Sequence, residues 1–221
     1  MVLVYALVLS AVLSAKLPGI ESRYAYAIYL TAGILAWSLF SEIITRCLTI
    51  FIDNGNLMKK VVFPRISLPL IVSGTALLNN ILLLFCILVI FLLLGHSPGV
   101  SVFILPVLMV INLCLALSIG LVLGVLNVFI RDVGQVVPVV LQFGFWLTPI
   151  VYSTSMIPES YVSYLGINPM YHITSAYHDV LLFNQVPAVS GLLVVCLLAI
   201  FFMGLAMFMF RKANAEMVDH L

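Results

Sequence analysis

The chain contains few charged residues, and this scarcity limits what kind of protein it can be. Only 8% of its 221 residues are Asp, Glu, Lys or Arg, whereas 64% are apolar. Soluble domains average about 25% charged residues, so the composition excludes an ordinary soluble protein. The net charge is +1, and the nine Lys and Arg residues are neither numerous nor clustered enough to form the basic surface of a nucleic-acid-binding protein, so binding to nucleic acid is not expected. The expected class is an all-α protein embedded in a membrane.

Motifs for nucleotide binding, metal binding and catalysis are absent from the sequence. Without a G-x-x-x-x-G-K-S/T loop, the chain is not expected to hold ATP phosphates itself. The four histidines and four cysteines lack metal-ligand spacing. Each cysteine stands alone in an apolar run, which is typical of a small packing residue. We therefore predict no catalytic residues, no metal and no bound cofactor. If the chain carries out uphill transport, the energy has to come from another protein.

Long apolar runs account for most of the chain. A spanning helix needs roughly 20 apolar residues to cross about 30 Å of hydrocarbon. Five runs reach this length, and one at the start is short or truncated. The expected spans are residues 1–15, 27–51, 69–94, 102–126, 136–156 and 189–210. The sequence therefore predicts one transmembrane domain of six helices over residues 1–221.

Lysines and arginines lie mainly on one side of this six-span arrangement. Seven lie on that side, and Lys16 and Arg23 lie on the other. The seven are Arg46, Lys59, Lys60, Arg65, Arg131, Arg211 and Lys212. Because Lys and Arg accumulate on the cytoplasmic side, both termini and the loop 52–68 are predicted to be cytoplasmic, and the segment 157–188 is predicted to lie outside.

The loop between the second and third spans has the pattern of a short amphipathic helix. Apolar residues between Leu57 and Val62 repeat at helical spacing, Lys59 and Lys60 take another face, and Pro64 ends the turn. Such a helix can lie on the inner leaflet with its lysines against anionic lipid, or it can dock into a partner ATPase. The pattern is compatible with both.

The outer segment mixes aromatic and imidazole side chains with apolar residues between prolines. Its polar aromatic residues are Tyr171, His172, Tyr177 and His178. The pattern predicts a re-entrant or interfacial helical pair before the last span. The four side chains can form an aromatic belt at the interface or line an outer gate.

Polar and small residues inside the spans predict contacts between helices. Glu42 and Arg46 are four residues apart and share one helix face, so we expect a charge pair, which is favoured over a direct role in the translocation path. Groups expected to hydrogen-bond between helices are Asn79, Asn80, Asn112 and Gln142. The small residues Ala116, Gly120 and Gly124 are expected to allow close helix packing or to form a dimer seam.

Three blocks of the sequence carry a family resemblance. They are WSLFSEIITRCLTIFIDNGNLMKKVVFPR at 37–65, RDVGQVVPVVLQFGFWLTPIVY at 131–152 and NPMYHITSAYHDVLLF at 168–183. Together they resemble the membrane subunit of type-two ABC transporters that export O-antigen, teichoic acid or capsular glycan. The resemblance implies a six-span permease of the bacterial inner membrane, in contact with membrane lipid. It also implies a homodimer on two separate ATPase subunits, which bind ATP and Mg²⁺, and a lipid-linked polysaccharide as cargo.

The resemblance also assigns roles to residues. Those implied to contact the ATPase are Asn56, Leu57, Lys59, Lys60, Arg65, Arg131 and Asp132. Those implied to line the conduit are Trp37, Phe40, Phe143, Phe145, Trp146 and Tyr152. Aromatic rings offer flat contact to the apolar faces of sugars, although they can equally face lipid. Two alternatives are a related permease for a drug or small lipid, and a secondary transporter, which would need an unpaired ionisable group in the membrane.

Overall fold

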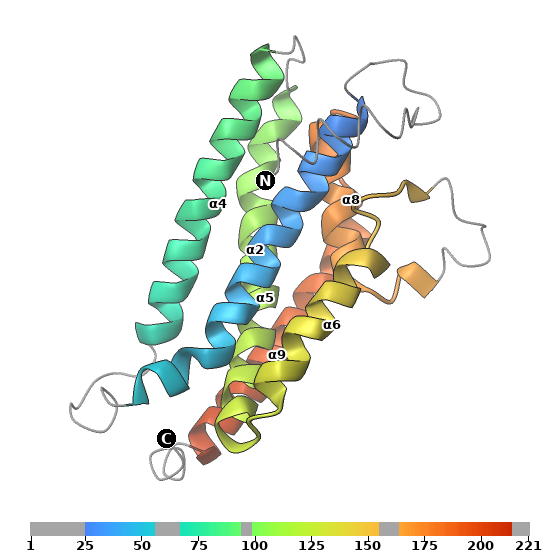
Figure 1. Cartoon of the computed structure of the whole chain (residues 1–221). Helices are drawn as coiled ribbons and strands as arrows, with labels where there is room; N and C mark the ends of the chain where they lie inside the picture. Colours follow the sequence, from blue (N-terminus) through green and yellow to red (C-terminus); the bar gives the residue numbers. More distant parts are fainter. Residues whose placement is uncertain (1–24, 56–66, 94–98, 155–163, 214–221) are drawn as a thin grey trace.

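The computed structural model describes residues 25–55, 67–93, 99–154 and 164–213, and their regular elements are helical (Figure 1). In chain order these are α2 (Ala25–Asp53), α4 (Ser67–Leu93), the 3-10 helix η1 (Val100–Ile104), α5 (Leu105–Phe129), α6 (Val133–Leu147), α8 (Pro169–Leu181) and α9 (Val189–Ala213). The all-α prediction is confirmed for these ranges. The predicted first span, residues 1–15, lies outside them.

Within the described ranges, four helices are long and apolar enough to cross a membrane. They are α2, α4, α5 together with η1, and α9. Their ends lie within three residues of four of the predicted spans. The chain is therefore an integral membrane protein.

The fifth predicted span, 136–156, is shorter in the structure than the apolar run suggests. Helix α6 has 15 residues and ends at Leu147, so it rises only about 22 Å. A residue before proline disfavours the helical region, and Thr148, which precedes Pro149, has an extended backbone (φ −94°, ψ 136°). The Thr148 hydroxyl donates back to the carbonyl oxygen of Gly144 at 2.8 Å. The chain therefore turns at Pro149 and does not continue the helix.

Helices α2, α4, α5, α6 and α9 alternate in direction along the chain, so several helix ends and a corner meet at one end of the bundle (Figure 1). The ends of α2 and α9, the start of α4 and the α5–α6 corner lie there. Arg131, Arg211 and Lys212 lie at this end, and Arg46 lies two helical turns from it. We call this end of the bundle the basic end. These four residues thus lie toward the same end, as the sequence analysis predicts.

Among the spans of the described residues, helix α2 is the most enclosed, because α5 packs closely against it. The buried share of its most apolar window is 67%, against 22%, 39% and 17% for α4, α5 with η1, and α9. A Cβ at Gly120 would lie 2.8 Å from the Cβ of Cys47, and one at Gly124 would collide with the Cys47 carbonyl oxygen. Ala116 is fully buried on the same helix. The predicted close packing is confirmed, and because these residues pack inside the chain they are not free to form a dimer seam.

Asparagine side chains from α4 and α5 bind the backbone of α2. Each donates its amide N–H to a carbonyl oxygen of α2. The pairs are Asn80 to Leu35 at 3.0 Å, Asn112 to Ala36 at 2.8 Å and Asn127 to Leu48 at 2.8 Å. The predicted interhelix role of Asn80 and Asn112 is confirmed, and Asn127 adds a third contact that the sequence interpretation missed.

Candidate translocation surface

The side of α2 that the other helices leave uncovered is polar. Between Trp37 and Asp53, nine of its side chains are not buried. Seven of the nine are hydroxylic or charged: Ser38, Ser41, Glu42, Thr45, Arg46, Thr49 and Asp53. Because these seven recur at helical spacing, they lie on one face. We call them the α2 polar stripe.

The neighbouring spans present apolar side chains outward. Leu82 and Phe85 of α4 are exposed, as are Ile200, Phe201 and Phe208 of α9. Such surfaces suit the hydrocarbon of a bilayer, whereas charged groups facing it are costly. The α2 polar stripe therefore requires water, protein or a polar cargo beside it.

Two grooves lie between α2 and α6, and Trp37 contributes to both. The first has a volume of about 540 Å³, is lined mainly by apolar side chains of α2, α5 and α6, and extends from Asp132 to Thr148 and Asn168. The second has a volume of about 410 Å³ and borders the α2 polar stripe. Its lining residues are Trp37, Ser41, Thr45, Pro138, Leu141, Gln142, Phe145 and Trp146. We call the second the polar groove; it offers hydroxyls, an amide and aromatic rings together.

Four of the predicted conduit residues form one aromatic cluster. The centroid of the Trp37 ring lies 5.6 Å from that of the Phe40 ring and 5.9 Å from that of the Phe145 ring. The centroids of the Phe145 and Trp146 rings are 5.6 Å apart. Gly144 permits this approach, because a Cβ there would lie 3.1 Å from Cη2 of Trp37. The cluster joins α2 to α6 along both grooves.

The other two predicted conduit residues lie elsewhere. Phe143 is 65% exposed and lines neither groove. Tyr152 lies in the turn after α6, where its carbonyl oxygen accepts a hydrogen bond from the Tyr29 hydroxyl at 2.9 Å. Their predicted contact with cargo remains a prediction.

The predicted ATPase contacts fall into two groups. Arg131 and Asp132 are exposed at the α5–α6 corner, at the basic end. The backbone closes this corner tightly, since the N–H of Val133 donates to the carbonyl oxygen of Ile130 at 3.1 Å. The other group, Asn56, Leu57, Lys59, Lys60 and Arg65, lies outside the described residues.

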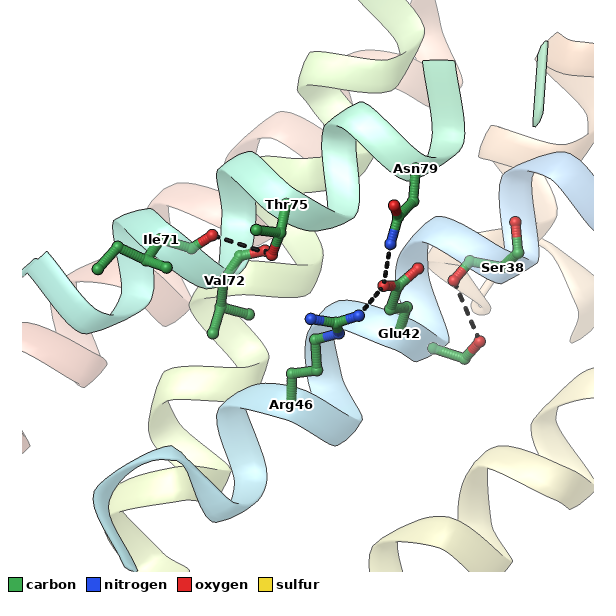
Figure 2. A network of polar contacts seen from close by, with 8 residues as sticks. Ser38, Glu42, Arg46, Ile71, Val72, Thr75 and Asn79 are labelled. Atoms are coloured by element: carbon green, nitrogen blue, oxygen red, sulfur yellow. Dashed lines mark hydrogen bonds and ion pairs between the residues drawn. The ribbon is translucent and has the colours of Figure 1, made fainter. Parts of the chain in front are cut away.

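The predicted charge pair in α2 is present. Nη2 of Arg46 lies 2.7 Å from Oε1 of Glu42, and the amide of Asn79 on α4 donates to the same oxygen at 3.0 Å (Figure 2). The Arg46 and Glu42 side chains remain 46% and 28% exposed. The pair is therefore formed at the surface of the single chain and is not sealed in its core.

At the other end of the bundle, the outer segment forms helix α8 within the described residues. Tyr177 and His178 are buried against the rest of the chain, whereas Tyr171 and His172 are partly exposed. Nε2 of His172 lies 2.9 Å from the carbonyl oxygen of Gly166 and so donates to it. The predicted helical pair and outer gate remain predictions, because residues 155–163 lie outside the described ranges.

A contact between α2 and α8 fixes the turn after α6, and the sequence interpretation missed it. The ring of His178 stacks on Tyr29 at 3.7 Å, and its Nε2 donates to the Tyr29 carbonyl oxygen at 3.0 Å. The Tyr29 hydroxyl lies within hydrogen-bonding distance of the carbonyl oxygens of Pro149 and Tyr152, at 3.0 and 2.9 Å. Gly33 leaves room, since a Cβ there would lie 3.2 Å from Nε2 of His178.

The burial of His178 predicts a loss of stability in acid. Burial lowers the pKa of His178 to about 3, because the charged ring would lose its hydration, whereas an unfolded histidine has a pKa of about 6.5. Between these values the unfolded state binds a proton that the folded state does not. The free energy of unfolding should therefore fall as the pH decreases from about 6.5, by about 2 kcal/mol at pH 5.

Thermal unfolding of the purified protein in detergent at pH 7.5 and pH 5 measures this effect. The His178→Phe variant keeps an aromatic ring on Tyr29 but cannot titrate, so its stability should depend less on pH. An equal pH dependence in both proteins would contradict this role for His178.

Within the described ranges, no three His, Cys, Asp or Glu side chains come together in a way that could hold a metal ion. This surface combines the α2 polar stripe, the polar groove and the aromatic cluster, with an exposed corner at the basic end.

Known proteins with similar sequences identify the family. Residues 1–182 match the family described as ABC-2 type transporter. The O-antigen export system permease protein RfbA of Klebsiella pneumoniae is 26% identical, over 80% of this chain and 66% of its own length. The protein of the same name in Myxococcus xanthus is 26% identical, over 99% of this chain and 83% of its own length. A second Klebsiella pneumoniae RfbA is 27% identical, over 76% of this chain and 63% of its own length.

The chain thus spans about two thirds of the length of the two Klebsiella relatives. The family match covers most of the chain and includes six of the seven helical elements of the described residues in full, together with all of the grooves' lining residues. This match agrees with the three sequence blocks and the apolar spans of the chain. The chain belongs to the ABC-2 type transporter family.

Proposed function

We propose that this chain is the permease subunit of an exporter that moves a lipid-linked, O-antigen-like polysaccharide across the bacterial inner membrane. The names of its relatives support the cargo class. The structural observation that carries the proposal is the α2 polar stripe beside the polar groove and the aromatic cluster. Sugars have hydroxyl groups as well as apolar ring faces, so a glycan suits a surface that combines hydroxyls with aromatic rings.

The assembly that we propose is a homodimer on two copies of an ABC ATPase subunit. Family membership implies such an ATPase, and in this proposal ATP and Mg²⁺ bind to that partner. The basic end would face the cytoplasm, where Arg131 and Asp132 are accessible to it. The polar groove is open on one side in the single chain, and a second copy facing the α2 polar stripe would enclose a path.

Deletion of the gene in its native host tests the proposed cargo. Lipid-linked glycan should accumulate on the cytoplasmic side while surface polymer is lost, and a plasmid copy should restore export. Normal surface polymer in the deletion strain would contradict the proposal. Sensitivity to a drug with unchanged polymer would instead indicate the alternative cargo, a drug or small lipid.

Trp146→Ala should impair export of long glycans more than export of short ones. Each aromatic contact contributes about 1 kcal/mol, and a long chain makes such a contact repeatedly during its passage. The length distribution of surface glycan on gels measures the effect, with protein abundance checked on blots.

Leu147→Ala is the matched control for this variant. Leu147 is 65% exposed and Trp146 is 59% exposed on the same helix, but only Trp146 lines the polar groove. The control should leave the length distribution unchanged. If both variants behave alike, Trp146 has a role in packing or lipid contact.

A further inference from the structure

Arg46 occupies an unusual place for a cation. It lies within the body of a spanning helix, seven residues before Asp53 at the end of α2, which corresponds to about 10 Å along the axis. Arg131, Arg211 and Lys212, by contrast, lie at corners or in a last helical turn. A cation at this depth is costly unless a polar or anionic group meets it.

Glu42 meets only part of this requirement. A guanidinium carries five N–H donors in a planar fork, and within the described residues the ion pair uses Nη2. The Arg46 side chain is 46% exposed, more than the 28% of its partner. The fork therefore keeps donors for a ligand on the open side.

The Glu42 carboxylate also accepts a hydrogen bond from the neighbouring helix α4. Asn79 of α4 donates to Oε1 of Glu42, the same oxygen that binds Arg46, and Figure 2 shows Asn79, Glu42 and Arg46 in sequence between α4 and α2. This arrangement orients Arg46 through Glu42 and Asn79. Thr45, Thr49 and Thr75 add exposed or partly exposed hydroxyl-bearing side chains on the same two helices.

We propose that Arg46 binds the phosphate of a membrane lipid that enters between α2 and α4 from the leaflet at the basic end. Phosphate matches the planar fork of arginine, which binds it through two parallel hydrogen bonds. The distance of about 10 Å from the helix end places the side chain within reach of headgroups. Glu42 and Asn79 are positioning residues in this site.

The proposal deepens the proposed function, on which it rests only for the identity of the lipid. If the chain exports a lipid-linked glycan, the phosphate of the carrier lipid is the expected ligand. A bulk phospholipid offers the same chemistry, and the two sources differ in the lipid tail and in the group that the phosphate carries.

Lipid binding to the full permease, purified with its ATPase subunit, tests the site. The probes are a polyprenyl diphosphate, the polyprenol of equal length, and phosphatidylglycerol, each measured by native mass spectrometry over a concentration series. Arg46→Gln should weaken binding of the phosphate-bearing probe about tenfold, as expected for loss of a charge-assisted hydrogen bond, and should leave polyprenol unchanged. A loss confined to the diphosphate identifies the carrier lipid, and a loss that includes phosphatidylglycerol identifies a general lipid phosphate site.

Glu42→Gln separates ligand contact from a purely structural charge pair. It removes the negative charge but keeps an oxygen for Asn79, so phosphate binding should be retained or strengthened. If Arg46→Gln alone accumulates poorly, Arg46→Gln combined with Glu42→Gln restores a neutral pair and replaces it in the assay. Unchanged diphosphate and phosphatidylglycerol binding in the arginine variant, or an equal loss in Glu42→Gln, would overturn the proposal. The gene-deletion phenotype tests the export function independently of this result.

Discussion

Replacing Gly124 with valine is expected to remove most of the folded protein from the membrane. A Cβ at this position would collide with the backbone carbonyl oxygen of Cys47, and the backbone of a packed helix cannot move aside as a flexible side chain can. Helix α5 would have to move away from α2, which also disturbs the neighbouring contact at Gly120. Overpacking of this kind costs about 3 kcal/mol, a large part of the stability of a domain.

The amount of monodisperse protein after mild detergent extraction, together with its thermal unfolding temperature, measures this loss. Gly204→Val on α9 is the matched control, because a Cβ there meets no atom within 4 Å. The control should behave like the unchanged protein. Equal recovery of the Gly124 and Gly204 variants would show that the close α2–α5 contact does not limit stability.

Reversing two charges, with Lys59→Glu and Lys60→Glu together, should abolish export while leaving the protein inserted. These lysines lie outside the described residues, but the chain enters and leaves their loop at the basic end, after Asp53 and before Ser67. A partner surface that accepts two positive charges would meet two negative ones, and such like-charge contacts cost several kcal/mol. Surface glycan and co-purification of the ATPase subunit measure the outcome.

The double change to glutamine separates the two interpretations of this loop. If the lysines only rest on anionic lipid, each contributes about 1 kcal/mol to membrane attraction, which the spanning helices make redundant. Both double variants should then export normally. Loss of export and of the ATPase in the glutamate variant, with a milder defect in the glutamine variant, would support coupling.

The bounds of the spans were predictable because hydrophobic length is the dominant constraint on a helix in a bilayer. Four spans agree with the structure within three residues. The end of α6 could not be predicted in this way, because the apolar run continues through Pro149. Hydropathy does not include the effect of a proline on the backbone of the residue before it, here Thr148. The contact of Tyr29 with His178 joins residues 149 positions apart, and no local pattern in the sequence indicates such a pairing.

The candidate surface was predictable only in part. The charge pair of Glu42 and Arg46 follows from helical spacing, and the aromatic residues of α6 stand out in any apolar run. Ser41 and Thr45 were missed, although they recur at the same spacing as the pair. The sequence does show that polar residues are unevenly distributed around this apolar span. Predicting from it that Ser41 and Thr45 belong to the surface requires knowing that α5 and α8 cover other faces of α2.

Cysteine reactivity provides the most direct test of the claim that the α2 polar stripe faces a polar path. Ser41→Cys, Thr45→Cys and Ile200→Cys are introduced singly after the four native cysteines are replaced, and each is treated with a membrane-impermeant, charged thiol reagent in the assembled transporter. Thiolates form in water and not in hydrocarbon, so positions 41 and 45 should react at least about tenfold faster than position 200. Ile200 is 69% exposed in the single chain. If exposure in the single chain alone decided the labelling rate, position 200 would therefore not react more slowly than positions 41 and 45. Equally slow labelling of all three positions would contradict the account.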